Sequence, residues 1–163
     1  IAPAAKTVSR GAAHDFALFQ KVININLCGT FNVASQSALG MSNADALNND
    51  NERGVIINTA SVAAFEGQMG QAAYGASKAA LIAIAKQYGT HLAHDGVRVN
   101  MLTLGGVAAG QDQEFVDKFV SHVPQAQMLS RNDVIGAMVF LLSDDSRAMT
   151  GQNVVVDGGF TAW

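Results

Sequence analysis

The sequence predicts an α/β fold built on a doubly wound parallel sheet. Short β-branched apolar runs alternate with longer segments of helical period, which is the order expected of right-handed βαβ units. The 163 residues are 49% apolar and only 14% charged, which is enough apolar material for one packed core. The 16 glycines far outnumber the 2 prolines, a composition unlike that of a linker. We therefore expect residues 1–163 to form one domain, or part of one.

The first expected elements are a long helix and a loop. From residue 15 to about residue 41, apolar side chains recur at three- and four-residue steps, as on a helix with a broad buried face. Residues 43–53 are rich in Asn and Asp and have no period, which predicts a surface loop that Gly54 closes.

Strands and helices alternate in the rest of the chain. The first expected strand is a continuous β-branched run, typical of a strand buried on both faces. Residues 71–94 contain no proline and much alanine, which predicts a helix between the first two strands. Residues 114–123 and 133–142 predict two amphipathic helices before the last strand. Strands are expected at residues 55–57, 97–102 and 152–156.

Charge, hydropathy and cysteine content exclude several classes of protein. The sequence has 10 Lys and Arg and 13 Asp and Glu, a formal net charge of −3, and no run of basic residues. Nucleic acid is therefore not an expected partner. The longest wholly apolar stretch, residues 79–85, is far shorter than the ~20 residues that span a bilayer, so no membrane contact is expected. Cys28 is the single cysteine and no leader precedes it, which makes the cytoplasm the expected compartment.

The most informative constellation comprises Ser61, Tyr74 and Lys78. Tyr74 and Lys78 lie four residues apart, which places them on one face of a helix. A phenol is a poor base at neutral pH, and a nearby ammonium group favours its phenolate form. Ser61 would hold a substrate oxygen while Tyr74 passes the proton, which suits a carbonyl and alcohol pair. A Tyr and Lys at this spacing alone are usually a surface pair, so the prediction depends on the surrounding sequence.

Two neighbouring patterns have simpler interpretations. His91 and His94 have no third imidazole or thiol arranged near them, so they are expected to be solvated helix-end residues and no metal site is predicted. Ser77 and Lys78 are adjacent, so on a helix they point about 100° apart and do not form a hydrolase nucleophile pair.

Taken together, the motifs resemble the short-chain dehydrogenase/reductase family. Ser61 lies thirteen residues before the tyrosine of a Tyr-x-x-x-Lys motif, and a Val-Asp-Gly-Gly sequence follows near the end. The resemblance covers nearly the whole chain and implies a Rossmann-like fold. The matching segments are residues 26–31, 58–61, 74–78, 98–100 and 151–159.

The resemblance implies a role for each catalytic position. Tyr74 would be the acid/base, and Lys78 would favour its phenolate form and hold the ribose of the nicotinamide. Ser61 would orient the substrate oxygen. Asn26 would anchor a water that relays protons outward from Lys78.

The implied cofactor is NAD or NADP, with NAD slightly favoured. Gly105 would bind it, and Val107 would offer its backbone to the carboxamide. The chain departs from the family in having Leu104 where proline is usual and Ala109 where a threonine commonly contacts the cofactor. Loss of that hydroxyl would weaken cofactor binding by about 0.5–1.5 kcal/mol, the usual net value of one hydrogen bond.

Within the family, residues 54–68 and 71–74 look most like the 3-hydroxyacyl-CoA and type 10 hydroxysteroid dehydrogenase branch. In that branch Gln68 and Gln71 would line the substrate pocket, whereas the end of the chain looks like less specialised bacterial members. The implied substrate is a small alcohol or ketone, with a 3-hydroxyacyl-CoA as one candidate. The alanine-rich face of the helix at 71–94 is either ordinary core or, as the resemblance implies, the contact of a homodimer or homotetramer.

The family's cofactor half has no counterpart in this sequence. The chain begins Ile1-Ala2-Pro3, like the middle of a loop, and contains no glycine-rich turn at which a helix N-terminus would bind a pyrophosphate. We therefore expect a partial domain without the N-terminal half of the Rossmann-like fold. Two hypotheses follow: the catalytic portion of an NAD(P)-dependent alcohol dehydrogenase or carbonyl reductase, or a truncated non-catalytic relative acting as a structural subunit of a hetero-oligomer.

Overall fold

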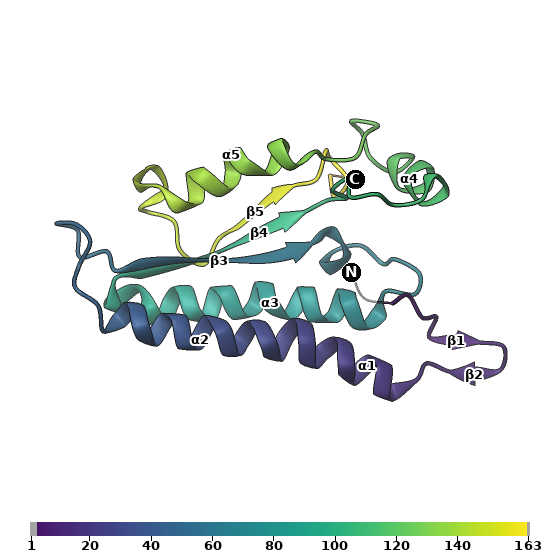
Figure 1. The fold of residues 1–163 in the computed structure, drawn as a ribbon, viewed down its shortest axis with the longest axis horizontal. Helices are drawn as coiled ribbons and strands as arrows, with labels where there is room; N and C mark the ends of the chain where they lie inside the picture. Colours follow the sequence, from purple (N-terminus) through teal and green to yellow (C-terminus); the bar gives the residue numbers. More distant parts are fainter. Residues whose placement is uncertain (1–2, 163) are drawn as a thin grey trace.

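A three-stranded parallel sheet in the order β3-β4-β5 forms the centre of the molecule (Figure 1). The computed structural model describes residues 3–162. The loop expected at Ile1 and Ala2 and the family-like ending expected at Trp163 therefore lie outside the described residues. The strands confirm the predicted α/β fold, although β3 continues past residue 57 to Ser61. Their bounds are β3 (Gly54–Ser61), β4 (Val97–Leu104) and β5 (Asn153–Val156).

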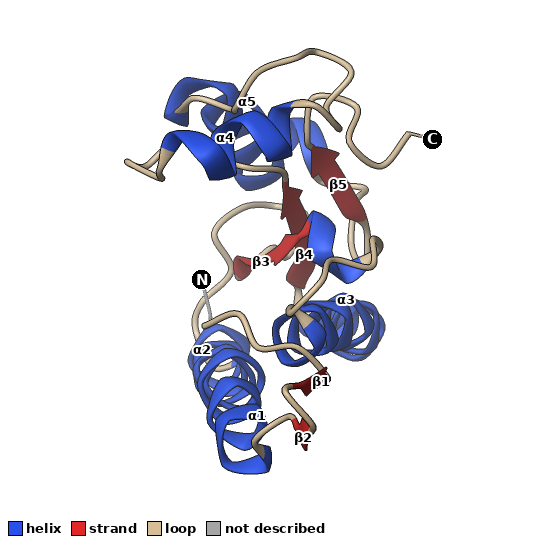
Figure 2. Cartoon of the chain, turned by 90° about the vertical axis from the view of Figure 1, so that its right-hand side faces the viewer, coloured by secondary structure: helices blue, strands red, loops and turns tan. Residues whose placement is uncertain are grey.

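Helices cover both faces of this sheet, as expected of a doubly wound fold (Figure 2). One face carries α1, α2 and α3, and the other carries α5, with α4 on the α5 side beyond the carboxyl ends of the strands. The helix predicted over residues 15–41 is interrupted by a π-helical turn, in which the Gly29 N–H donates to the carbonyl oxygen of Asn24. The bounds are α1 (Phe16–Ile23), the π-helical turn (Asn24–Cys28), α2 (Gly29–Ser42), α3 (Ala72–His91), α4 (Gln113–Val120) and α5 (Arg131–Leu142).

Each face of the sheet has its own apolar core. On the α3 side, Leu81 packs in one cluster with Val99 and Met101 of β4. On the α5 side, Leu102 of β4 packs with Leu141. Alternate residues of β4 therefore serve opposite cores, as the two-residue period of a strand requires.

The strand that is buried on both faces is β4 and not the predicted run at 55–57. Seven of the eight β4 residues are buried, whereas Val55 and Ile57 of β3 are only partly buried. The prediction was wrong because β4 has a strand on each side and a helix layer on each face. In the part of the chain that the structure describes, β3 pairs with β4 alone.

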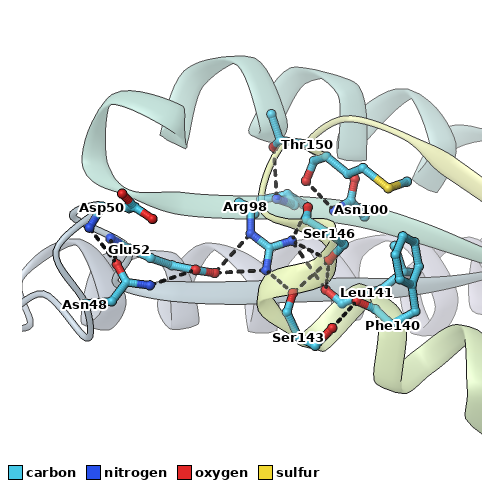
Figure 3. A network of polar contacts seen from close by, with 12 residues as sticks. Asn48, Asp50, Glu52, Arg98, Asn100, Phe140, Leu141, Ser143, Ser146 and Thr150 are labelled. Carbon is cyan, nitrogen blue, oxygen red and sulfur yellow. Dashed lines mark hydrogen bonds and ion pairs between the residues drawn. The ribbon is translucent and has the colours of Figure 1, made fainter.

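A buried arginine joins β4 to the end of α5 (Figure 3). Arg98 is 8% exposed, and its Nη2 atom lies 2.9 Å from Oε1 of Glu52 in the loop before β3. Its guanidinium also donates to the carbonyl oxygens of Ser146 at 3.1 Å and Ser143 at 3.3 Å. Its Nη1 atom also donates to the carbonyl oxygen of Leu141 at 3.4 Å, in the last turn of α5, where carbonyls have no partner within the helix.

A short hairpin before α1 was not predicted. Strands β1 (Val8–Ser9) and β2 (Ala12–Ala13) are joined by Arg10 and Gly11, both with positive φ, as type I′ turns require. Strands of two residues carry no detectable period. Over residues 3–162, no helix is long and apolar enough to cross a membrane, and no three His, Cys, Asp or Glu side chains gather as a metal site would need.

Candidate active site

The carboxyl ends of β3 and β4 and the start of α3 surround a cavity of about 450 Å³. This is the end of a parallel sheet where ligands bind in doubly wound folds. Its lining contains every site residue predicted from the sequence except Asn26. These are Ser61, Gln68, Gln71, Tyr74, Lys78, Gly105 and Val107.

Ser61 is the last residue of β3 and the first residue of the turn that leads toward α3. Its Oγ atom accepts a hydrogen bond from the Ala63 N–H at 3.3 Å, which caps the 3-10 turn Val62–Ala64. This turn packs directly on α3 because residue 75 is glycine: a Cβ there would lie 2.6 Å from the carbonyl oxygen of Ala63. The close contact brings Tyr74 and Ser61 to the same cavity.

Lys78 lines the cavity and is bonded to strand β3. Its Nζ atom donates to the carbonyl oxygen of Thr59 at 2.9 Å and lies 5.8 Å from the centre of the Tyr74 ring. Partial burial lowers the pKa of the Lys78 ammonium group from its ordinary value. The pair predicted from the four-residue spacing therefore shares one site.

Asn26 lies outside the cavity, on the π-helical turn. Its Nδ2 atom donates to Ser77 Oγ at 3.2 Å, and Ser77 Oγ donates to the carbonyl oxygen of Tyr74 at 2.7 Å. Ser77 is fully buried. Asn26 thus contacts the helix turn that carries Tyr74 and Lys78, and its predicted part in a proton relay stays a prediction.

The loop after β4 provides the opposite side of the cavity. A Cβ at Gly105 would lie 2.9 Å from Cα of Asp157, so only glycine lets the ends of β4 and β5 approach this closely. The carbonyl of Val107 accepts a hydrogen bond from Gln111 Nε2 at 2.8 Å. The Val107 N–H makes no hydrogen bond to residues 3–162, which leaves a donor at the cavity wall.

Gln68 and Gln71 line the cavity on the side of the loop before α3. The side-chain oxygen of Gln71 is buried and has no hydrogen-bond partner within the described residues. A buried acceptor without a partner carries a free-energy cost.

Two aromatic residues of the site were missed by the sequence reasoning. Phe115 and Phe119 of α4 also line the cavity. The signal was present as two phenylalanines four residues apart on an amphipathic helix that follows the carboxyl end of a strand.

A family model described as enoyl-(acyl carrier protein) reductase, which belongs to the short-chain dehydrogenase/reductases, matches residues 1–161. The chain is a member of the short-chain dehydrogenase/reductase family. This confirms the family predicted from the motifs. The parallel sheet flanked by helices is the corresponding part of the Rossmann-like fold of these enzymes.

Several proteins of this family are similar to the chain over part of their length. The 3-hydroxyacyl-CoA dehydrogenase type-2 of Drosophila melanogaster is 49% identical over 106 residues, covering 64% of this chain and 41% of that protein. The human (3R)-3-hydroxyacyl-CoA dehydrogenase is 36% identical over 145 residues, covering 86% of this chain and 53% of that protein. The chain therefore spans about half the length of these short-chain dehydrogenase/reductases or less.

Solved structures of the family superpose on nearly the whole chain. The 3-hydroxyacyl-CoA dehydrogenase type-2 of Mycobacterium avium has a TM-score of 0.87 at 32% identity, covering 95% of this chain and 61% of that one. A gluconate 5-dehydrogenase from Burkholderia cenocepacia, in complex with NADP and tartrate, has a TM-score of 0.86 at 27% identity, covering 100% of this chain and 62% of that one.

Proposed function

We propose that the chain carries the acid–base half of an NAD(P)-dependent oxidoreductase that interconverts an alcohol and a carbonyl. The observation that carries this proposal is the convergence of Ser61, Tyr74 and Lys78 on one cavity at the carboxyl end of the sheet. Family membership supports it, because short-chain dehydrogenase/reductases act on CH–OH groups.

Each side chain has a distinct task in this proposal. Tyr74 transfers a proton between its phenolic oxygen and the substrate oxygen, with Ser61 Oγ as a second hydrogen-bond partner of that oxygen. Lys78 places a positive charge beside the Tyr74 ring, and its bond to Thr59 holds the ammonium group there. Because Ser61 and Lys78 are hydrogen-bonded before substrate arrives, they need little reorganisation at the moment of proton transfer.

The residues present fit a nicotinamide cofactor. Gly105 keeps the β4 end free of side-chain atoms, the free N–H of Val107 is a donor for a carboxamide oxygen, and Lys78 is a donor for ribose hydroxyls. When bound, the nicotinamide supplies the site that accepts or donates the hydride. Ala109 lines the same cavity without the hydroxyl that is common in the family. NAD, slightly favoured over NADP, is the cofactor we propose.

The substrate class follows from the relatives and from the two glutamines. The proteins named 3-hydroxyacyl-CoA dehydrogenase are similar to this chain over 64–86% of its length. We assign Gln68 and Gln71 to substrate binding, because both line the cavity. A 3-hydroxyacyl thioester, or a similar secondary alcohol, is the proposed substrate.

A homodimer or homotetramer is proposed as the assembly. Large apolar side chains are exposed along α1 and α2, and contact with a second copy of the chain would bury them. These residues are Phe16, Phe31, Val33 and Leu39.

The cytoplasm stays a prediction as the compartment.

The test is a hydride-transfer assay with acetoacetyl-CoA and NADH or NADPH, run on this chain and on a version extended upstream in its gene. Tyr74→Phe should lower the rate at least a hundredfold, because it removes the only proton-transferring group of the proposal. Tyr88→Phe is the matched control, since Tyr88 also lies on α3 but contacts Phe31 instead of the cavity. An unchanged rate in Tyr74→Phe contradicts the assigned chemistry.

Binding of NADH and NADPH, followed by fluorescence titration of the same proteins, separates the two functional hypotheses. Binding supports the oxidoreductase. If neither protein binds either nucleotide, the structural-subunit hypothesis gains, and co-expression with an intact relative followed by mass analysis of the assembly would test it.

A further inference from the structure

We propose that Ser77 is a positioning residue, which sets the direction of the Asn26 side-chain amide and holds the helical turn that carries Tyr74 and Lys78. This inference rests on the proposed function, because it adds a residue to the support of the same site. Ser77 has no part in the mechanism proposed above, although its buried hydroxyl lies between two of the residues expected at the site.

Ser77 is the middle member of a hydrogen-bond chain that joins α3 to the π-helical turn. Its Oγ atom accepts a hydrogen bond from Nδ2 of Asn26 at 3.2 Å and donates one to the carbonyl oxygen of Tyr74 at 2.7 Å. Ser77 is 0% exposed, so water does not replace either partner. The chain therefore connects two helical segments through a single buried hydroxyl.

The single proton of this hydroxyl gives the chain its direction. A serine side chain has one hydrogen to donate and two lone pairs that accept. Because Ser77 donates its proton to the Tyr74 carbonyl oxygen, its Oγ atom is left to accept from Asn26. The Asn26 amide must therefore present its nitrogen to Ser77, and its Oδ1 atom becomes the acceptor that faces away from α3.

The face of α3 that carries Tyr74 and Lys78 is held from both flanks. Successive helix residues are about 100° apart, so Gly75 and Ser77 each lie about 80° from the middle of this face, on opposite sides. The backbone of Gly75 packs against the carbonyl of Ala63 on one flank. The hydroxyl of Ser77 provides the polar contact on the other flank, and its loss leaves that flank without an anchor.

Ser77 acts on the reaction through its neighbours. It is not among the residues 3–162 that line the cavity, so it does not touch a substrate there. Proton transfer depends steeply on the placement of the transferring group, so a displaced helical turn slows the chemistry even when the substrate still binds. Ser77→Ala should therefore lower kcat roughly tenfold and leave KM nearly unchanged.

The direct test is NMR spectroscopy of this chain, which needs neither a cofactor nor turnover. In Ser77→Ala, the side-chain N–H resonances of Asn26 and the carbonyl ¹³C resonance of Tyr74 should both move, because both groups lose their partner. Asn26→Asp keeps the shape of the side chain, but a carboxylate only accepts, so the Ser77 proton turns toward it. The Tyr74 carbonyl resonance should then shift as in Ser77→Ala, although Ser77 is intact.

Ser146→Ala is the matched control for the loss of a buried hydroxyl (Figure 3). Ser146 is 1% exposed, and its Oγ atom accepts from Nη1 of Arg98 at 3.0 Å and donates to the carbonyl oxygen of Leu141 at 3.0 Å. This arrangement resembles that of Ser77 but lies outside the lining of the cavity. Ser146→Ala should therefore lose stability and keep its kcat, once rates are divided by the folded fraction from thermal melts.

Ser77→Thr separates the hydroxyl from the remainder of the side chain. A threonine on a helix keeps a hydroxyl that bonds to a carbonyl in the preceding turn. In the hydride-transfer assay on the version extended upstream, Ser77→Thr should recover most of the rate that Ser77→Ala loses. Circular dichroism establishes that each variant is folded.

Two outcomes overturn the proposal: an unchanged Tyr74 carbonyl resonance in folded Asn26→Asp, or a kcat in Ser77→Ala that falls no further than in Ser146→Ala. The resonances are measured without substrate or NAD(P)H, so they decide the matter even if the parent is inactive. Failure of the hydrogen-bond chain is therefore distinguishable from failure of the oxidoreductase assignment, which the nucleotide titration and Tyr74→Phe report.

Discussion

The ammonium group of Lys78 donates a hydrogen bond to the carbonyl oxygen of Thr59 at 2.9 Å, which ties the first turns of α3 to the end of β3. The bond crosses from helix to sheet at the point where the proposed acid–base pair begins. It gives the lysine a fixed place although no carboxylate lies within ion-pair distance of it in the described residues. The cost of holding a partly buried ammonium group there has a measurable consequence.

That consequence is a pH-dependent difference between Lys78→Met and the parent. Burial lowers the pKa of Lys78 from 10.5 in the folded state, so below 10.5 the unfolded chain binds more protons. The parent should therefore gain stability relative to Lys78→Met as the pH rises toward 10.5. Urea denaturation of both proteins across this range measures the difference.

Lys118→Met is the control of opposite sign for that experiment. The hydrogen bond from Lys118 to Glu114 raises the pKa of the Lys118 ammonium group above 10.5. Its contribution is present below 10.5 and is lost as the pH rises through the folded-state pKa. Parallel slopes in the two variants would contradict the assignment of the Lys78 shift to burial.

Gly75→Ala should destabilise the protein and displace Tyr74. A methyl group there would lie 2.6 Å from the carbonyl oxygen of Ala63, so the start of α3 must move from the turn after Ser61. We expect a loss of about 1–3 kcal/mol in the free energy of unfolding, as for other overpacked contacts. Guanidinium denaturation measures it.

Gly40→Ala is the matched control, since Gly40 is helical and a Cβ there meets nothing within 4 Å. It should stabilise α2 by about 0.5–1 kcal/mol. A loss of stability in Gly40→Ala, or no loss in Gly75→Ala, would contradict the argument that Gly75 is required for the close contact with Ala63.

Arg98→Met should be among the most destabilising single changes. It leaves the Glu52 carboxylate, with a side chain 13% exposed, without its cation, and it removes donors from the end of α5. Breaking a buried pair in this way costs about 3–5 kcal/mol. Glu114→Gln, which breaks the exposed pair with Lys118, should cost far less because water screens that pair. Thermal melts of both variants check the contrast, and equal losses would count against it.

Asp157→Asn should lose stability in a way that disappears in acid. Burial alone would raise the pKa of the Asp157 carboxyl, but hydrogen bonds from Thr161, Gly159 and Phe160 outweigh it and hold the pKa below 3.8. The stabilisation is present above 3.8 and is lost as the pH falls through the folded-state pKa. Denaturation at neutral pH and at decreasing acidic pH should show a stability gap between variant and parent that narrows as the pH falls below 3.8. A gap that stays constant contradicts the role of the charge.

The elements that were predicted correctly are those that the local sequence alone indicates. The β-branched residues of β4 and the alanines of α3 can be interpreted without knowledge of distant residues. The motif around Ser61, Tyr74 and Lys78 lies at the strand end and helix start that the order of elements requires. Sequence reasoning therefore placed the sheet, its order of elements and the polar side of the cavity.

What escaped prediction depends on contacts between distant segments. The π-helical turn packs through Asn26 on Ser77, 51 residues further along the chain. Arg98 donates a hydrogen bond to the carboxylate of Glu52, which lies 46 residues earlier in the chain. The phenylalanines of α4 fit the pattern of any amphipathic helix, and only the packed fold determines that Phe115 faces a cavity instead of the core.

The parallel pairing of β3 with β4 also bears on how the chain folds. Gly54 pairs with Val97 and Ser61 with Leu104, so no ladder bond of the central sheet joins neighbours in sequence. A nucleus formed from local contacts alone cannot include this sheet, because the loop between the strands must close first. Helix α3 lies in the connection between β3 and β4, and its early formation leaves fewer flexible residues to order when the two strands pair. Folding of this chain should therefore be slow for its size and should respond more to helix propensity in α3 than to changes within the strands.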